Sequence, residues 1–140
     1  MTGHTESPNT PFPGKEVPLR DKVQILKLFL SRYRIFPDGE IPINIPTACL
    51  VDGEIVDATF IVSDAFSQVE RVYFFVESGD ALENETLHIC APSEAFEYLQ
   101  SKEPWEDYDI CLFDNTLSWC FAISHNDRYV IAHASSITTV

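Results

Sequence analysis

The stretch DICLFDNTLSWCFAISHNDRYVIAHA, residues 109–134, decides the fold. Its apolar runs are separated by Asp114-Asn115-Thr116 and His125-Asn126-Asp127, whose short polar side chains favour tight turns. Runs of five to eight residues between such turns are typical of strands. We therefore expect a three-stranded antiparallel meander over residues 109–113, 117–124 and 128–134.

The middle strand of this meander has two different faces, because side chains alternate along a strand. One face is large and apolar: Leu117, Trp119, Phe121 and Ile123. The other is small: Ser118, Cys120, Ala122 and Ser124. A helix is expected to pack closely over the small face.

The rest of the chain supplies further strands and two helices. Strands are predicted over residues 47–51 and 54–62, joined by an Asp52-Gly53 hairpin turn, and over 69–77 and 86–90. The strand at 69–77 is apolar on both faces. Helices are predicted over 18–35, from an apolar stripe at spacings of three and four, and over 92–102. Residues 63–68 fit either a short helix or a loop.

These elements predict an α+β domain over residues 18–140. It would hold a mostly antiparallel sheet of five or six strands, with two helices packed on one face. The polar, proline-containing residues 1–17 are expected to form a flexible, disordered N-terminal tail. No signal peptide or membrane span is recognisable, and the four cysteines form no Cys-x-x-Cys pair, so we expect free thiols and a cytoplasmic location.

Charge is divided very unevenly along the chain. Residues 1–36 have a net charge of +3, and residues 37–140 have −16, from nineteen acids and three bases, which gives −13 in total. A body this acidic repels nucleic acid and anionic membranes and attracts basic partners. We therefore expect a basic protein partner, with no binding of nucleic acid or membrane.

The sequence contains residue types that several kinds of active site use, but not at the spacing that these sites require. His88 and Cys90 form one loose pair, with His125 and His133 distant in sequence, whereas structural zinc sites use close pairs at both ends. A nucleophilic Cys120 or Cys49 with a histidine base would sit mid-strand in an acidic body, which disfavours the thiolate. Carboxylate pairs arise by chance, and no glycine-rich phosphate loop is present. We predict no catalytic residue, metal or cofactor.

The acidic segments between residues 77 and 109 are the candidate partner-binding site. Acids surrounding aromatic residues can form an anchor with a charged rim. The predicted contact residues are Glu83, Glu85, Trp105, Glu106, Asp107, Tyr108 and Asp109, and Asp52, Glu54 and Asp57 near the first hairpin would add charge. Two other interpretations remain open: the acids form a solvated face, and the two aromatics cover the end of the sheet.

The run FDNTLSWCFAISHND, residues 113–127, resembles the final hairpin of small immunity proteins from bacterial polymorphic-toxin and contact-dependent inhibition systems. The shared features are an aromatic and an Asp before a turn, a mid-strand Trp, and a Ser-His turn before the last strand. The resemblance implies a non-catalytic cytoplasmic protein that binds and blocks a toxin domain. It assigns no toxin contact to these residues, because the shared features are those that build the hairpin itself.

The expected function is therefore an acidic binding protein that covers the active site of a basic, nuclease-like toxin domain. One alternative is a small enzyme or ligand-binding domain with a pocket between helix and sheet, using His125, His133 or Cys120. The other is an adaptor or structural subunit that dimerises through an exposed strand edge.

Overall fold

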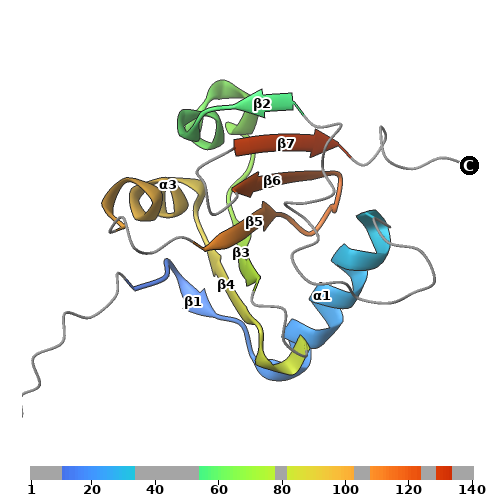
Figure 1. The fold of residues 1–140 in the computed structure, drawn as a ribbon. Helices are drawn as coiled ribbons and strands as arrows, with labels where there is room; N and C mark the ends of the chain where they lie inside the picture. Colours follow the sequence, from blue (N-terminus) through green and yellow to red (C-terminus); the bar gives the residue numbers. More distant parts are fainter. Residues whose placement is uncertain (1–10, 34–53, 78–81, 103–107, 124–128, 134–140) are drawn as a thin grey trace, which may run out of the picture.

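The computed structural model describes residues 11–33, 54–77, 82–102, 108–123 and 129–133 (Figure 1). Within these residues seven antiparallel strands form one sheet, in the order β1-β4-β3-β5-β6-β7-β2. The strands are β1 (Lys15–Glu16), β2 (Glu54–Val56), β3 (Val72–Glu77), β4 (Thr86–Cys90), β5 (Asp109–Phe113), β6 (Trp119–Ile123) and β7 (Tyr129–His133). The predicted α+β class is confirmed, with seven strands in place of the predicted five or six, and the meander is confirmed as β5, β6 and β7.

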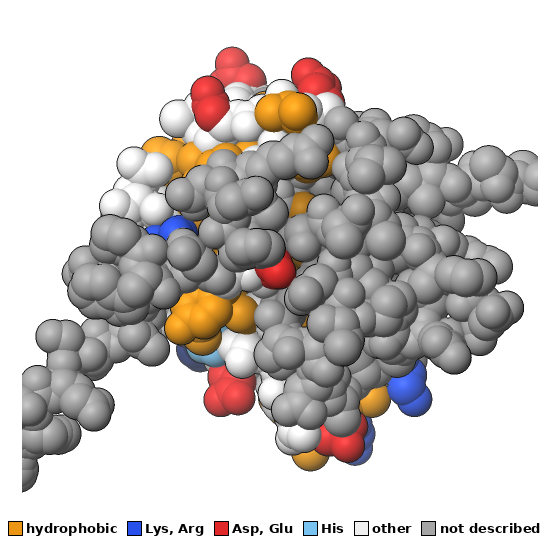
Figure 2. All heavy atoms as spheres, viewed as in Figure 1, with side chains coloured by type: hydrophobic (Ala, Val, Ile, Leu, Met, Phe, Trp, Pro, Cys, Tyr) orange, Lys and Arg blue, Asp and Glu red, His pale blue; other side chains and the backbone are white. Residues whose placement is uncertain are grey.

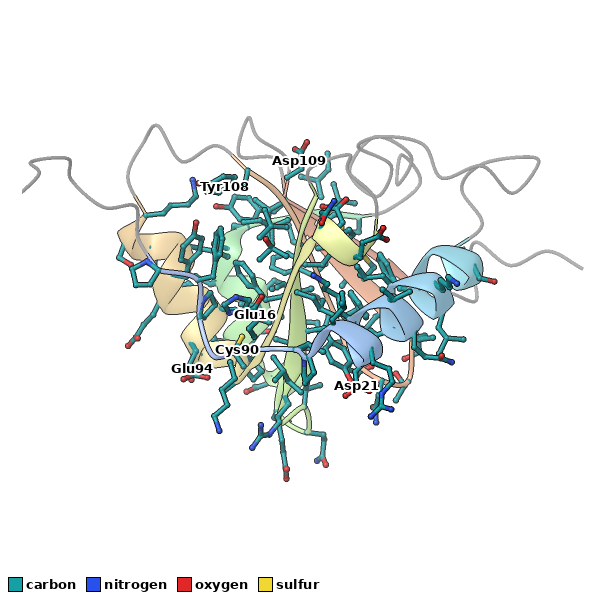
Figure 3. The ribbon with its side chains drawn as sticks, turned by 90° about the horizontal axis from the view of Figure 1, so that it is seen from below. Glu16, Asp21, Cys90, Glu94, Tyr108 and Asp109 are labelled. Carbon is teal, nitrogen blue, oxygen red and sulfur yellow. The ribbon has the colours of Figure 1, made fainter. Side chains whose placement is uncertain are left out.

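The two helices lie on opposite faces of the sheet, so the prediction that both pack on one face is wrong. Figure 3 shows the sheet between them, with α1 (Leu19–Tyr33) on one side and α3 (Pro92–Ser101) on the other. The cause lies in β3, whose Phe74 and Phe75 are both buried and point to opposite faces. A strand that is apolar on both sides needs a cover on each.

The α1 face is closed by aromatic stacking. Phe29 of α1 lies flat on Phe113 of β5, with ring centroids 4.0 Å apart and planes inclined by 10°. Cys120 and Ala122 of β6 are buried in the same cluster. This confirms that the small face of the middle strand receives a helix.

The α3 face is covered by α3 and by two short 3₁₀ helices, η2 (Ala58–Val62) and η3 (Asp64–Phe66). Tyr98 of α3 meets Phe74 edge to face, with centroids 5.3 Å apart. Phe66 of η3 packs against Trp119 at 4.7 Å. A third 3₁₀ helix, η4 (Leu82–Asn84), precedes β4.

The strand predicted over residues 54–62 ends at Val56, and residues 58–62 form η2 instead. Asp57 causes the change, because its Oδ1 accepts a hydrogen bond from the Thr59 N–H at 3.0 Å and caps the new helix. The alternation of side chains over residues 54–62 predicted one continuous strand, but the hydrogen bond to Asp57 starts a helix after Val56. The ambiguous segment 63–68 contains η3.

The predicted tail over residues 1–17 is too long, because residues 11–17 belong to the domain. Lys15 and Glu16 pair with β4, and the Val17 N–H donates to the Leu87 carbonyl at 2.9 Å. Phe12 packs against Phe74 and Tyr98. Phe12, which lies between two prolines, thus holds the N-terminal segment against the α3 face of the sheet.

Some predictions fall outside the described part of the chain: residues 1–10, the strand over 47–51 and the Asp52-Gly53 turn. None of the helices in the described part has the length and apolarity needed to cross a bilayer.

Candidate functional site

The loop around η4 contains two of the predicted contact acids and is fixed to α1 by a buried lysine. Lys22, which is only 6% exposed, donates from Nζ to the carbonyl oxygens of Glu83 at 2.8 Å and Glu85 at 2.7 Å. Glu83 is exposed, whereas Glu85 is only 6% exposed. Of the two carboxylates, only that of Glu83 is placed to meet a partner.

The second predicted segment is partly described. Trp105, Glu106 and Asp107 lie outside the described residues. Tyr108 is half-buried against Phe12, with centroids 5.5 Å apart, and Asp109, the first residue of β5, is 8% exposed. Tyr108 therefore covers the end of the sheet, and Asp109 has little surface to offer. The structure does not bring Glu83, Tyr108 and Asp109 together into one exposed group.

The acids near β2 are accessible. Glu54 and Asp57 are both exposed, and so is Asp64 in η3. Figure 2 shows acidic side chains gathered at the top of the molecule, which is the side of β2 in Figure 1. Asp52 lies outside the described residues.

The cysteines are poorly suited to nucleophilic chemistry where the structure describes them. Burial, reinforced by the charge of Glu94, raises the pKa of the Cys90 thiol to about 12, so at neutral pH it is protonated. Cys120 is fully buried in the α1 face, where no substrate can reach it. Cys49, His125 and the side chain of His133 lie outside the described residues.

His88 has a structural partner. Its Nδ1 lies 3.1 Å from the Pro13 carbonyl oxygen, and its ring meets Phe12 edge-on at 5.8 Å. These contacts place His88 beside the β1 segment. Among the residues that the structure describes, no three His, Cys, Asp or Glu side chains are grouped as a metal site.

An open groove lies along Tyr73 of β3 and Ile89 of β4, and α1 borders one of its two parts. It consists of two adjoining hollows of about 520 and 600 Å³ that share Tyr73 and Ile89. These two residues are cross-strand neighbours on β3 and β4, and Tyr73 also packs on Phe113 at 5.3 Å. Asp21 and Gln24 of α1 line one hollow, and Asp114 and Asn115 of the β5–β6 turn line the other.

The groove has an apolar floor and a polar rim of mixed sign. Lys15 and Arg71 contribute positive charge beside the acids. No histidine or cysteine occurs among its described lining residues, so it does not contain the residues of the predicted pocket alternative. The sequence contains no signal for it, because the half-burial of Tyr73 depends on its packing against distant segments such as β5.

No protein-family model, no curated protein and no solved structure is detectably similar to this chain.

Proposed function

We propose that this protein is a non-catalytic acidic binding protein that inhibits a basic, nuclease-like toxin domain by covering its active site. The observation that supports this role is the charge of residues 37–140, where nineteen acids oppose three bases. Carboxylates at such density can take the place of substrate phosphates in a basic cleft. They also accelerate association by electrostatic steering.

The chemistry of the described side chains supports binding over catalysis. Cys90 is held as a thiol, Cys120 is inaccessible, and His88 is occupied by a backbone carbonyl and an aromatic ring. The resemblance of residues 113–127 to the last hairpin of immunity proteins points in the same direction. Inhibition of a toxin is the specific form of the binding role that we propose.

The experiment is an affinity capture from the native host at low salt, eluted by a salt gradient and followed by reconstitution with the purified partner. We expect one basic protein, bound at equal stoichiometry and released at a defined salt step, whose nuclease activity falls in proportion to the added inhibitor. A partner that binds stoichiometrically and keeps its full activity would contradict inhibition but not binding. Recovery of no basic partner would contradict both.

A second function, binding of a small ligand, is favoured by the groove beside Tyr73 and Ile89. Each hollow lies within the size range of small-molecule sites, roughly 300–1,000 Å³. A fragment screen by NMR on the labelled chain tests it. Saturable shifts of the Tyr73 and Ile89 amides, lost in Tyr73→Ala and retained in Tyr73→Phe, would support a ligand site. Their absence across the screen would argue against it.

A further inference from the structure

The edge segment, defined here as residues 54–64, lies at an edge of the sheet and exposes large apolar side chains. No other segment in the described part of the chain does both. The edge segment contains β2, the last strand in the sheet order, and the adjoining η2. Ile55 is 65% exposed and Val62 is 44% exposed, so both are large apolar side chains that water reaches. Large exposed aliphatics on a sheet edge are a common mark of an interaction surface.

The charged residues within the edge segment have one sign. Glu54, Asp57 and Asp64 are all exposed, and the edge segment contains no lysine or arginine. The groove differs, because Lys15 and Arg71 line it together with its acids. Of these two surfaces, the edge segment is the one whose charge is wholly complementary to a basic partner.

The backbone of the edge segment is held in place, so its exposed side chains are presented on a fixed frame. Ile55 pairs with Val130 of β7, and Ile61 is fully buried on the α3 face. Asp57 caps η2 through the Thr59 N–H at 3.0 Å, and the Ser63 N–H donates to the Phe60 carbonyl at 3.1 Å. Little conformational entropy is lost when a preorganised surface binds.

We infer that the edge segment is the surface on which the basic partner docks, with Ile55 as the apolar anchor on the α1 face of β2 and Glu54 on its α3 face, while Asp57 and Asp64 add further negative charge. This inference rests on the proposed function and specifies its contact site. It places the contact away from Tyr108, which is half-buried, and from Asp109, which is buried. The occupant is a partner segment in which apolar side chains alternate with lysine or arginine. Such a segment meets Ile55 and the acids at once.

The test uses the full ¹⁵N-labelled chain and three synthetic decapeptides: alternating Lys-Val, alternating Lys-Ser and alternating Glu-Val. We expect the Lys-Val peptide to shift the amides of the edge segment. It should bind about tenfold more tightly than Lys-Ser, because of these two peptides only Lys-Val has apolar side chains that can pack against Ile55. The Glu-Val peptide should not bind, because its charge has the same sign as that of the edge segment.

Two matched pairs of variants give the assay its controls. Ile55→Thr keeps a β-branched residue on the strand and should weaken Lys-Val binding about five- to tenfold. Leu28→Gln removes an apolar side chain that is 50% exposed on α1 and should leave binding unchanged. Glu54→Gln with Asp64→Asn should flatten the salt dependence, whereas Glu70→Gln with Glu97→Gln, also exposed, should not.

The possible failures are distinguishable. If Lys-Val binds but shifts the amides around η4 or the groove, or if Leu28→Gln weakens it as much as Ile55→Thr, the edge segment is not the docking surface. The basic-partner proposal would survive that result. If Lys-Val binds no better than Glu-Val, the edge inference is overturned. The proposed function also fails if the affinity capture then recovers no basic partner.

Discussion

The Nζ of Lys22 lies 2.7 Å from the carbonyl oxygen of Glu85, sixty-three residues further along the chain. Together with the 2.8 Å bond to the Glu83 carbonyl, it fixes the acidic loop to the first turns of α1. A buried ammonium is costly unless its donors are satisfied. Two backbone acceptors satisfy two of the three donors of Lys22, and the same bonds hold η4 and the start of β4 at a defined position beside α1.

Replacing this lysine should therefore destabilise the protein. Lys22→Met keeps the aliphatic stem but removes both hydrogen bonds, and we expect the free energy of unfolding to fall by about 2–3 kcal/mol. Urea denaturation measures the change. Lys27→Met, at an exposed position of the same helix, is the control and should change stability by less than about 0.5 kcal/mol. Equal effects of the two variants would show that the contact with the loop contributes nothing.

Gly14 is expected to be indispensable for the attachment of β1. Its φ is +75°, and a Cβ built on it would lie 2.0 Å from the Ile89 carbonyl oxygen and 2.6 Å from the Cys90 Cβ. Gly14→Ala should cost about 1–3 kcal/mol, because the strain and the clash act together. The informative measurement is hydrogen exchange at the Val17 N–H, which bonds to Leu87.

For this variant we expect faster exchange at Val17, while amides of the β5–β6 ladder are less affected. Lys15→Ala, at the neighbouring exposed position, should leave the Val17 protection unchanged. Normal protection in Gly14→Ala would mean that β1 accommodates the side chain by shifting.

The stack between Phe29 and Phe113 should appear as a coupling energy. Offset or stacked aromatic pairs contribute about 0.5–1.5 kcal/mol beyond the area that they bury. A double-mutant cycle with Phe29→Leu and Phe113→Leu should give a coupling in this range. Phe29→Leu combined with Phe74→Leu, on the opposite face of the sheet, should be additive within about 0.5 kcal/mol. Additivity in both cycles would refute a specific role for the stack.

Much of the fold was predictable because its signals are local. The turn residues 114–116 and the alternation along β6 predict the β5–β6 part of the meander, and proline with Glu94 marks the start of α3, where Glu94 accepts from the Ala91 N–H at 2.8 Å. The distribution of the helices between the faces was not predictable in this way. A strand that is apolar on both sides requires two covers, but its sequence does not state which element supplies each.

The candidate site was predicted less well, for a physical reason. Glu85 and Asp109 are acidic in sequence but buried in the fold, and burial depends on contacts with distant segments. Phe12 is the clearest case, because a residue in a proline-rich stretch packs against Phe74 and Tyr98, far along the chain. Glu54 and Asp57, close to the predicted hairpin turn, remained exposed as expected.

The Cys90 thiol should make stability fall at alkaline pH. Burial, with a smaller contribution from Glu94, raises its pKa from 9.0 to about 12 in the folded state. Above pH 9 the unfolded chain loses this proton while the folded chain keeps it, so the contribution of Cys90 is complete below pH 9 and is lost as the pH rises toward 12. Cys90→Ala, compared with the unsubstituted chain by urea denaturation at several pH values, should show a shallower alkaline decline. Alkylation at about pH 8 with peptide-level mass spectrometry gives a second readout, in which Cys90 should react in urea but not in the native protein. Rapid native alkylation of Cys90 would contradict its buried, protonated state.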